Sequence, residues 1–179
     1  MIRNKLGAVI ALTSLALAGC KEEVPFTSPD GKVADAISAF TFSGHAVDGL
    51  IANGDVNVYD FAGGQRGAIL GSGMTDAFGA FTAQVEGVNA QTGQYVMACV
   101  ESGAYTEEAS GAEIELGEGD ELCAVKFFDP SSKFEVVINP WSHYATAHAQ
   151  YLIKDGKDVN SAVDSANTAI STIYGFDNL

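Results

Sequence analysis

The sequence has few basic residues. Nine lysines and arginines stand against 23 aspartates and glutamates in 179 residues, which gives a formal net charge of −14. Nucleic acid and anionic lipid head groups are poor partners for such a surface, because like charges repel. The sequence also has no G-x-S-x-G motif, no Walker loop, no H-E-x-x-H motif and no catalytic Cys/His pairing. We therefore expect a protein that is not an enzyme, needs no cofactor and binds no nucleic acid.

Apolar runs are short as well. The N-terminal run covers residues 6–18, contains two polar residues and follows the basic residues Arg3 and Lys5. A membrane-spanning helix needs about 20 apolar residues, whereas this layout is typical of a secretory signal. The run ends in Leu17-Ala18-Gly19-Cys20, which resembles the lipobox of bacterial lipoproteins.

The lipobox resemblance implies a signal peptide over residues 1–19, a diacylglycerol thioether on Cys20 and a further acyl chain, such as palmitate, on the new amino terminus. At about 0.8 kcal/mol per buried CH₂, two or more chains form a stable membrane anchor. Lys21, not an aspartate, follows the cysteine, so we expect a place in the cell envelope at the outer membrane, facing the periplasm or the surface. Residues 20–36 form the lipidated cysteine and a flexible tether. An ordinary cleaved signal with a chance cysteine is the alternative.

Cysteine is rare, with three in the whole chain. Cys99 and Cys123 lie on two candidate strands with apolar neighbours, and in an oxidising compartment such a pair usually forms a disulfide. The closed loop of 24 residues (123 minus 99) would stabilise the fold by roughly 3 kcal/mol on the chain-entropy model. Two buried free thiols are the alternative.

Short β-rich segments separated by Gly and Asp turns dominate the middle of the chain. They are residues 37–48, 55–60, 68–75, 80–85, 95–101, 112–116, 122–128 and 134–138. Seven or eight short strands at this spacing predict a mainly β domain over residues 37–138, with an antiparallel sandwich as its architecture.

Two motifs in this region resemble those of carboxypeptidase-regulatory-like domains. The segment from Gly44 to Asp60 is similar to their opening signature, although Leu50 and Asp55 depart from it, and Thr75-Asp76-Ala77-Phe78-Gly79-Ala80-Phe81 is similar to the second signature. The resemblance implies an antiparallel, transthyretin/Ig-like β-sandwich. In the second motif we expect Asp76 to cap a turn, Gly79 to take a positive φ and Phe81 to enter the core.

After Asn139-Pro140 the apolar period becomes helical, and residues 139–179 predict a helical hairpin. The first helix should end at Lys154-Asp155-Gly156, and Asp158 should cap the second, which should end at Gly175. The expected apolar stripe of the first helix is Trp141, Tyr144, Ala145, His148, Tyr151 and Leu152; that of the second is Val159, Ala162, Val163, Ala166, Ala169, Ile170 and Ile173. Both stripes should pack against the sandwich. The hairpin resembles a helical extension of some surface lipoproteins. The chain is then either a minimal version or a shortened version of such a protein, and both interpretations stay open.

Two sets of residues are candidate ligand sites. An acidic run that includes Glu107 and Glu108 permits a calcium site, although its spacing is not that of an EF-hand and a solvated loop is the alternative. Trp141, Tyr144 and Tyr151 permit an aromatic platform for sugar, with core packing as the alternative. We predict no other metal site, because the ring nitrogens of His143 and His148, five residues apart on a helix, would not converge.

Together these features predict a membrane-anchored lipoprotein of the cell envelope that serves as a non-catalytic structural or interaction module. A polysaccharide- or calcium-binding module is one alternative. The other is an accessory subunit of a larger envelope assembly, which would dock through the helices onto other envelope proteins. Cell-wall glycan and the membrane, through the lipid anchor, are the remaining expected partners.

Overall fold

The structure, a computed structural model, describes residues 39–175. The segments predicted as signal peptide, lipidated Cys20 and tether lie outside the described residues. The described strands are β1 (Phe40–Ala46), β2 (Asp55–Asp60), β3 (Ile69–Met74), β4 (Ala80–Val85), β5 (Gln94–Val100), β6 (Ala104–Thr106), β7 (Glu113–Glu115), β8 (Leu122–Phe128) and β9 (Phe134–Ile138). Two helices follow, α1 (Pro140–Lys154) and α2 (Val159–Tyr174).

The domain is mainly β with two C-terminal helices, as predicted. Strand β6 was not expected from the sequence. It pairs with β7 in a separate two-stranded sheet, and its three residues are too few to produce a visible alternation of apolar and polar side chains.

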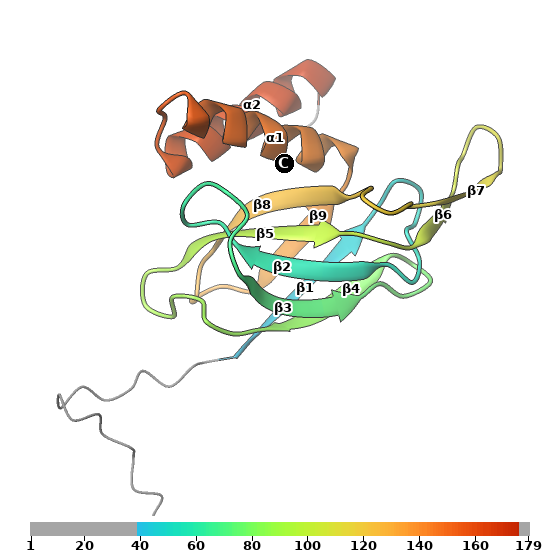
Figure 1. The fold of residues 1–179 in the computed structure, drawn as a ribbon, viewed down its shortest axis with the longest axis horizontal. Helices are drawn as coiled ribbons and strands as arrows, with labels where there is room; N and C mark the ends of the chain where they lie inside the picture. The colour runs from blue at the N-terminus through green and yellow to red at the C-terminus, as the bar shows by residue number, and fades with distance from the viewer. Residues whose placement is uncertain (1–38, 176–179) are drawn as a thin grey trace, which may run out of the picture. The chain divides into compact units, whose positions relative to one another are not determined.

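Seven strands form one mixed sheet in the order β8-β5-β2-β3-β4-β1-β9 (Figure 1). The prediction of an antiparallel sandwich is wrong in this respect, because β9 pairs with β1 in parallel, with Phe42 opposite Phe134. The sheet is also nearly closed on itself, since its edge strands β8 and β9 lie next to each other. The alternation of side chains identifies strands, but it does not identify their partners.

The main core lies inside this nearly closed sheet. Three aromatic rings from β1, β8 and β9 meet there: Phe42 stacks on Phe134 at 4.0 Å and lies 5.0 Å from Phe128, centroid to centroid. Such ring pairs add about 0.5–1.5 kcal/mol to the free energy gained by burying their area. These contacts hold the two edge strands near each other without a shared ladder of hydrogen bonds.

A second core lies between the helices and the outer face of β2, β5 and β8. It combines Tyr59, Met97 and Cys123 from the sheet with Ala149 from α1 and Val163 from α2. Figure 1 shows the two helices together on this side of the sheet. Within the described part of the chain, neither helix is long and apolar enough to cross a membrane.

The helix ends follow the sequence signals. Asn139 caps α1 in a capping box with Ser142, Asp158 caps α2, and Gly175 ends α2 with a left-handed φ of 72°. Each cap satisfies backbone groups that the helix itself leaves without partners.

The expected apolar stripe of α1 is wrong in part. The buried residues are Ser142, Ala145, Thr146 and Ala149, whereas Tyr144 and Tyr151 are 52% and 66% exposed. Small side chains let the helix axis approach both the sheet and α2, and the large aromatic residues are displaced to the flanks. In α2, Ile173 is exposed as well, in contrast to the expectation.

Substitution of Gly44 should destabilise the fold. A Cβ atom on Gly44 would lie 2.1 Å from the Val136 carbonyl oxygen and 2.8 Å from the Phe81 ring. We expect Gly44→Ala to lower the free energy of unfolding by about 1–3 kcal/mol, as overpacking does. Denaturant unfolding measures this. The control Gly63→Ala, where a Cβ would meet nothing within 4 Å, should change it little; equal stability of the two variants would contradict the packing at β1.

Candidate functional site

Cys99 and Cys123 form a disulfide between β5 and β8. The two residues lie directly opposite each other in the antiparallel register, with Cα atoms 4.1 Å apart, and both are buried. In the described residues, Glu121 joins them in a group whose ligand atoms lie within 4.8 Å of one another. Because the two sulfurs are bonded to each other, they offer no thiolate to a metal in this state.

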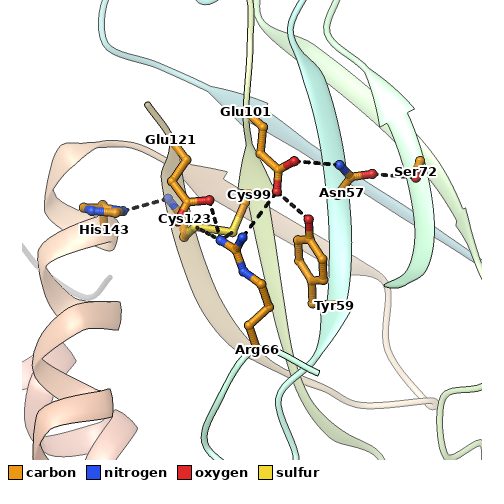
Figure 2. Close-up of polar contacts among 9 residues, drawn as sticks. All are labelled: Asn57, Tyr59, Arg66, Ser72, Cys99, Glu101, Glu121, Cys123 and His143. Carbon is orange, nitrogen blue, oxygen red and sulfur yellow. Dashed lines mark hydrogen bonds and ion pairs between the residues drawn. A yellow bond between two sulfur atoms is a disulfide. The ribbon is translucent and has the colours of Figure 1, made fainter. Parts of the chain in front are cut away.

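Arg66 lies over the disulfide (Figure 2). It comes from the loop between β2 and β3, and its Nη2 is 3.4 Å from the Cys99 sulfur and 3.6 Å from the Cys123 sulfur. The guanidinium donates to Glu121, and its carbon lies 4.6 Å from the centroid of the Tyr59 ring. Burial lowers the pKa of Arg66, but the hydrogen bond and charge of Glu121 outweigh this effect and raise it.

Glu101 joins this arrangement to the neighbouring strands. Its carboxylate accepts from the Tyr59 hydroxyl at 2.5 Å and from Asn57 Nδ2 at 2.9 Å, and it lies 3.7 Å from Arg66 Nη1. Ser72 donates to Asn57 Oδ1 at 2.7 Å. Burial, followed by the hydrogen bond to Glu101, raises the pKa of Tyr59 to about 12. The polar groups of this Arg66 network bind one another, and so they fasten the loop to the sheet.

Replacement of Tyr59 should flatten the alkaline stability profile. The folded chain keeps the Tyr59 proton up to pH about 12, whereas an unfolded tyrosine loses it near pH 10. Stability from this group is therefore complete below pH about 10 and falls as the pH rises towards 12. We expect Tyr59→Phe to remove a late step in tyrosinate absorbance and to reduce the loss of unfolding free energy over this interval. The control Tyr151→Phe should keep that late step; its survival in Tyr59→Phe would disprove the assignment.

A groove of about 890 Å³ lies beside the helices. Its walls come from β8, β9, β1 and β4, and its rim from the start of α1 and the middle of α2. Phe127 and Val137 line it while remaining 44% and 53% exposed. Trp141 lines it from the helix side. The volume and the apolar lining are typical of a small ligand-binding cleft.

Charged side chains lie at one part of the groove. The groove lining includes Lys126, Lys133, His45 and Glu135. Lys133 pairs with the Glu135 carboxylate, and Lys126 Nζ donates to the Glu135 carbonyl oxygen at 2.6 Å. The groove thus combines an apolar wall with two cations, in a domain that is acidic as a whole.

The predicted sugar platform is assembled only in part. Trp141 lies in the groove, with its ring 3.9 Å from Tyr174 and 6.0 Å from Tyr144, centroid to centroid. Tyr151 is not among the residues that line the groove. The sequence analysis missed Phe127 and Val137, because an apolar residue at an outward position of a strand looks the same in the sequence whether or not another layer covers it.

In the part of the chain that the structure describes, Glu107 and Glu108 belong to no group of three or more His, Cys, Asp or Glu residues whose ligand atoms lie close together. The hydroxyl of Ser110 and the backbone N–H groups of Ala109 and Ser110 donate to Glu107, and these hydrogen bonds lower the pKa of its carboxyl. Glu107 thus caps its own turn. Glu108 is exposed beside it.

The second signature motif forms the turn between β3 and β4. Asp76 Oδ1 accepts from the N–H groups of Phe78 at 2.8 Å and Ala80 at 3.0 Å, and Gly79 has a φ of 72°. Phe81 is buried in the main core. This motif has a structural role. It forms the turn that leads into β4, and β4 lines the groove.

No protein-family model and no curated protein matches this chain. The lipoprotein and carboxypeptidase-regulatory-like resemblances therefore rest on the sequence motifs alone.

Proposed function

We propose that this protein is a lipid-anchored, non-catalytic binding module of the cell envelope, and that its ligand binds in the groove lined by Phe127, Val137 and Trp141. The single observation that carries this proposal is the groove itself. Exposed apolar side chains in a concave site lose unfavourable contact with water when a ligand covers them.

The anchor is supported by the sequence around Cys20. Its small neighbours and the short apolar run before it suit cleavage and acylation. The disulfide between Cys99 and Cys123 is what an oxidising compartment outside the cytoplasm favours. The outer membrane is our proposed location, because no aspartate follows Cys20.

The non-catalytic role is supported by the Arg66 network. A general base or nucleophile needs a lone pair directed at a substrate, and a general acid needs a proton directed at it. Here the Glu101 carboxylate accepts from Tyr59 and Asn57, and Arg66 is held by Glu121. These groups stabilise a loop over the disulfide.

Glycan is the second candidate ligand. The specific observation in its favour is the aromatic cluster of Trp141, Tyr144 and Tyr174, in which the two tyrosines are about half exposed beside the groove. Aromatic rings present flat apolar surfaces on which sugar rings can stack.

Replacement of the lipobox cysteine tests the anchor. Cys20→Ser removes the thiol that would accept diacylglycerol, so we expect fatty-acid labelling to disappear and the protein to leave the membrane fraction. Metabolic labelling with radioactive palmitate measures this. Cys99→Ser is the control and should keep its label; a labelled Cys20→Ser protein would contradict the lipoprotein assignment.

A thermal-unfolding screen of the full chain in detergent tests the groove. A ligand at one hundred times its Kd stabilises the folded state by about 2.7 kcal/mol, and we expect such a shift from a cell-wall glycan or an extended peptide. Phe127→Ala and Val137→Ala should each require about a tenfold higher ligand concentration for the same stabilisation. Tyr151→Ala, which removes an exposed aromatic ring outside the groove lining, should not. A shift that persists in both groove variants, or no shift with either ligand class, would overturn the binding role of the groove.

A further inference from the structure

The floor of the groove is the outer face of β4, β1 and β9. Alternate residues of these strands enter the main core, so the residues between them point outward. Two rows of three outward residues cross the strands, and all six line the groove: Ala80, His45 and Val137 in one row, and Thr82, Ser43 and Glu135 in the other. Neighbouring strands lie about 4.8 Å apart and successive outward residues about 7 Å apart. The floor therefore offers enough area for a pyranose ring.

Neutral hydrogen-bonding groups lie beside apolar side chains in the lining. Thr82 contributes a hydroxyl from β4, and Asn167 contributes an amide from α2. Each of these groups both donates and accepts, as the hydroxyls of a sugar do. Phe127 and Trp141 supply apolar surface for the C–H face of a sugar ring. A purely apolar ligand, such as an alkyl chain, would cover the polar groups without giving them partners.

The charge of the lining is opposite to that of the domain. Between residues 39 and 175 the chain has five lysines and arginines and eighteen aspartates and glutamates, a net charge of −13 (five minus eighteen). Two of the five, Lys126 and Lys133, line the groove, but of the eighteen only Glu135 does. With His45 neutral, the net charge of the lining is +1 (two minus one). An anionic ligand is therefore favoured in the groove.

The basic groups lie around one point of the groove. The hydrogen bond and charge of Lys133 lower the pKa of the Glu135 carboxyl, and the charges of Lys126 and His45 lower it further. Lys133 is paired with this carboxylate, whereas Lys126 Nζ donates to a neutral acceptor, the Glu135 carbonyl oxygen, at 2.6 Å. An ammonium group forms a stronger hydrogen bond with a carboxylate than with a neutral oxygen. Lys126 is thus the cation that can turn to a ligand.

We propose that the groove binds an oligosaccharide that carries a carboxylate, as a uronic acid residue does. The sugar ring lies on the floor of β4, β1 and β9, where its hydroxyls bind Thr82 and Asn167, and the carboxylate binds Lys126 beside His45. One carboxylate matches the single net positive charge of the lining. This inference rests on the proposed function, because it names the class of ligand that the same groove binds.

The single tryptophan of the chain makes a direct test possible, because Trp141 lines the groove. The probe is a tetrasaccharide of three xyloses and one glucuronate, added to the full chain in detergent. The methyl ester of the same tetrasaccharide keeps the rings and hydroxyls but loses the charge. We expect a saturable change in tryptophan emission with the acid and at least a tenfold weaker affinity for the ester. Thermal unfolding provides a second readout of binding.

Two variants separate the charge from the sugar ring. Lys126→Gln should weaken binding of the acid at least fivefold and change binding of the ester less than about twofold. Thr82→Val keeps the shape of an exposed strand residue but removes its hydroxyl, so it should weaken acid and ester alike, at least threefold. Lys154→Gln, an equal loss of charge at an exposed lysine outside the lining, is the matched control and should change neither.

Equal affinity of the unchanged protein for acid and ester would overturn the carboxylate assignment, and this comparison does not depend on the folding of any variant. Absence of binding by both saccharides, together with a peptide-induced thermal shift that depends on Phe127, would overturn the saccharide and leave the proposed function in place. Absence of binding by saccharides and peptides would overturn both proposals.

Discussion

Strand β5 is buried on both faces, and the rest of the structure depends on this. Val96, Ala98 and Val100 point into the nearly closed sheet, while Met97 and Cys99 point outward. Burial of apolar area contributes about 25 cal/mol per Å², so an outward apolar face on the sheet requires a cover. The two helices provide it, and the disulfide from Cys99 ties β5 to β8 beneath them.

The position of α1 in turn explains the groove. Asn139 caps α1 directly after Ile138, so no loop separates β9 from the helix. Since α1 covers β8, its first turn meets the edge of that strand, and Ser142 and His143 bind the backbone of Cys123. The helix therefore occupies the place where β9 could pair with the start of β8. Strand β9 pairs with β1 instead, and the two edge strands lie close together without a shared ladder of hydrogen bonds.

The sequence predicts the elements well because each has a local cause. Short β-rich segments between turn signals mark eight of the nine strands, and Asn139, Asp158 and Gly175 mark the helix ends. The parallel pairing of β9 could not be predicted, because a period of two is the same whichever neighbour a strand chooses. The buried face of α1 was missed for a related reason: hydrophobicity favoured Tyr144 and Tyr151, whereas close approach requires alanine, serine and threonine.

The groove was hidden in the sequence because Phe127 and Val137 have the spacing of ordinary strand residues that pack against a second layer. Only the arrangement of β8, β9 and α1 leaves them without such a layer. The net charge of the chain also differs in its effect from the charges that line the groove. The acidic surface acts on a partner at long range, but exposed charges are screened beyond about 8 Å at physiological ionic strength. The groove lining itself carries Lys126, Lys133 and the Glu135 carboxylate that pairs with Lys133, so its local charge differs from the acidic net charge of the chain.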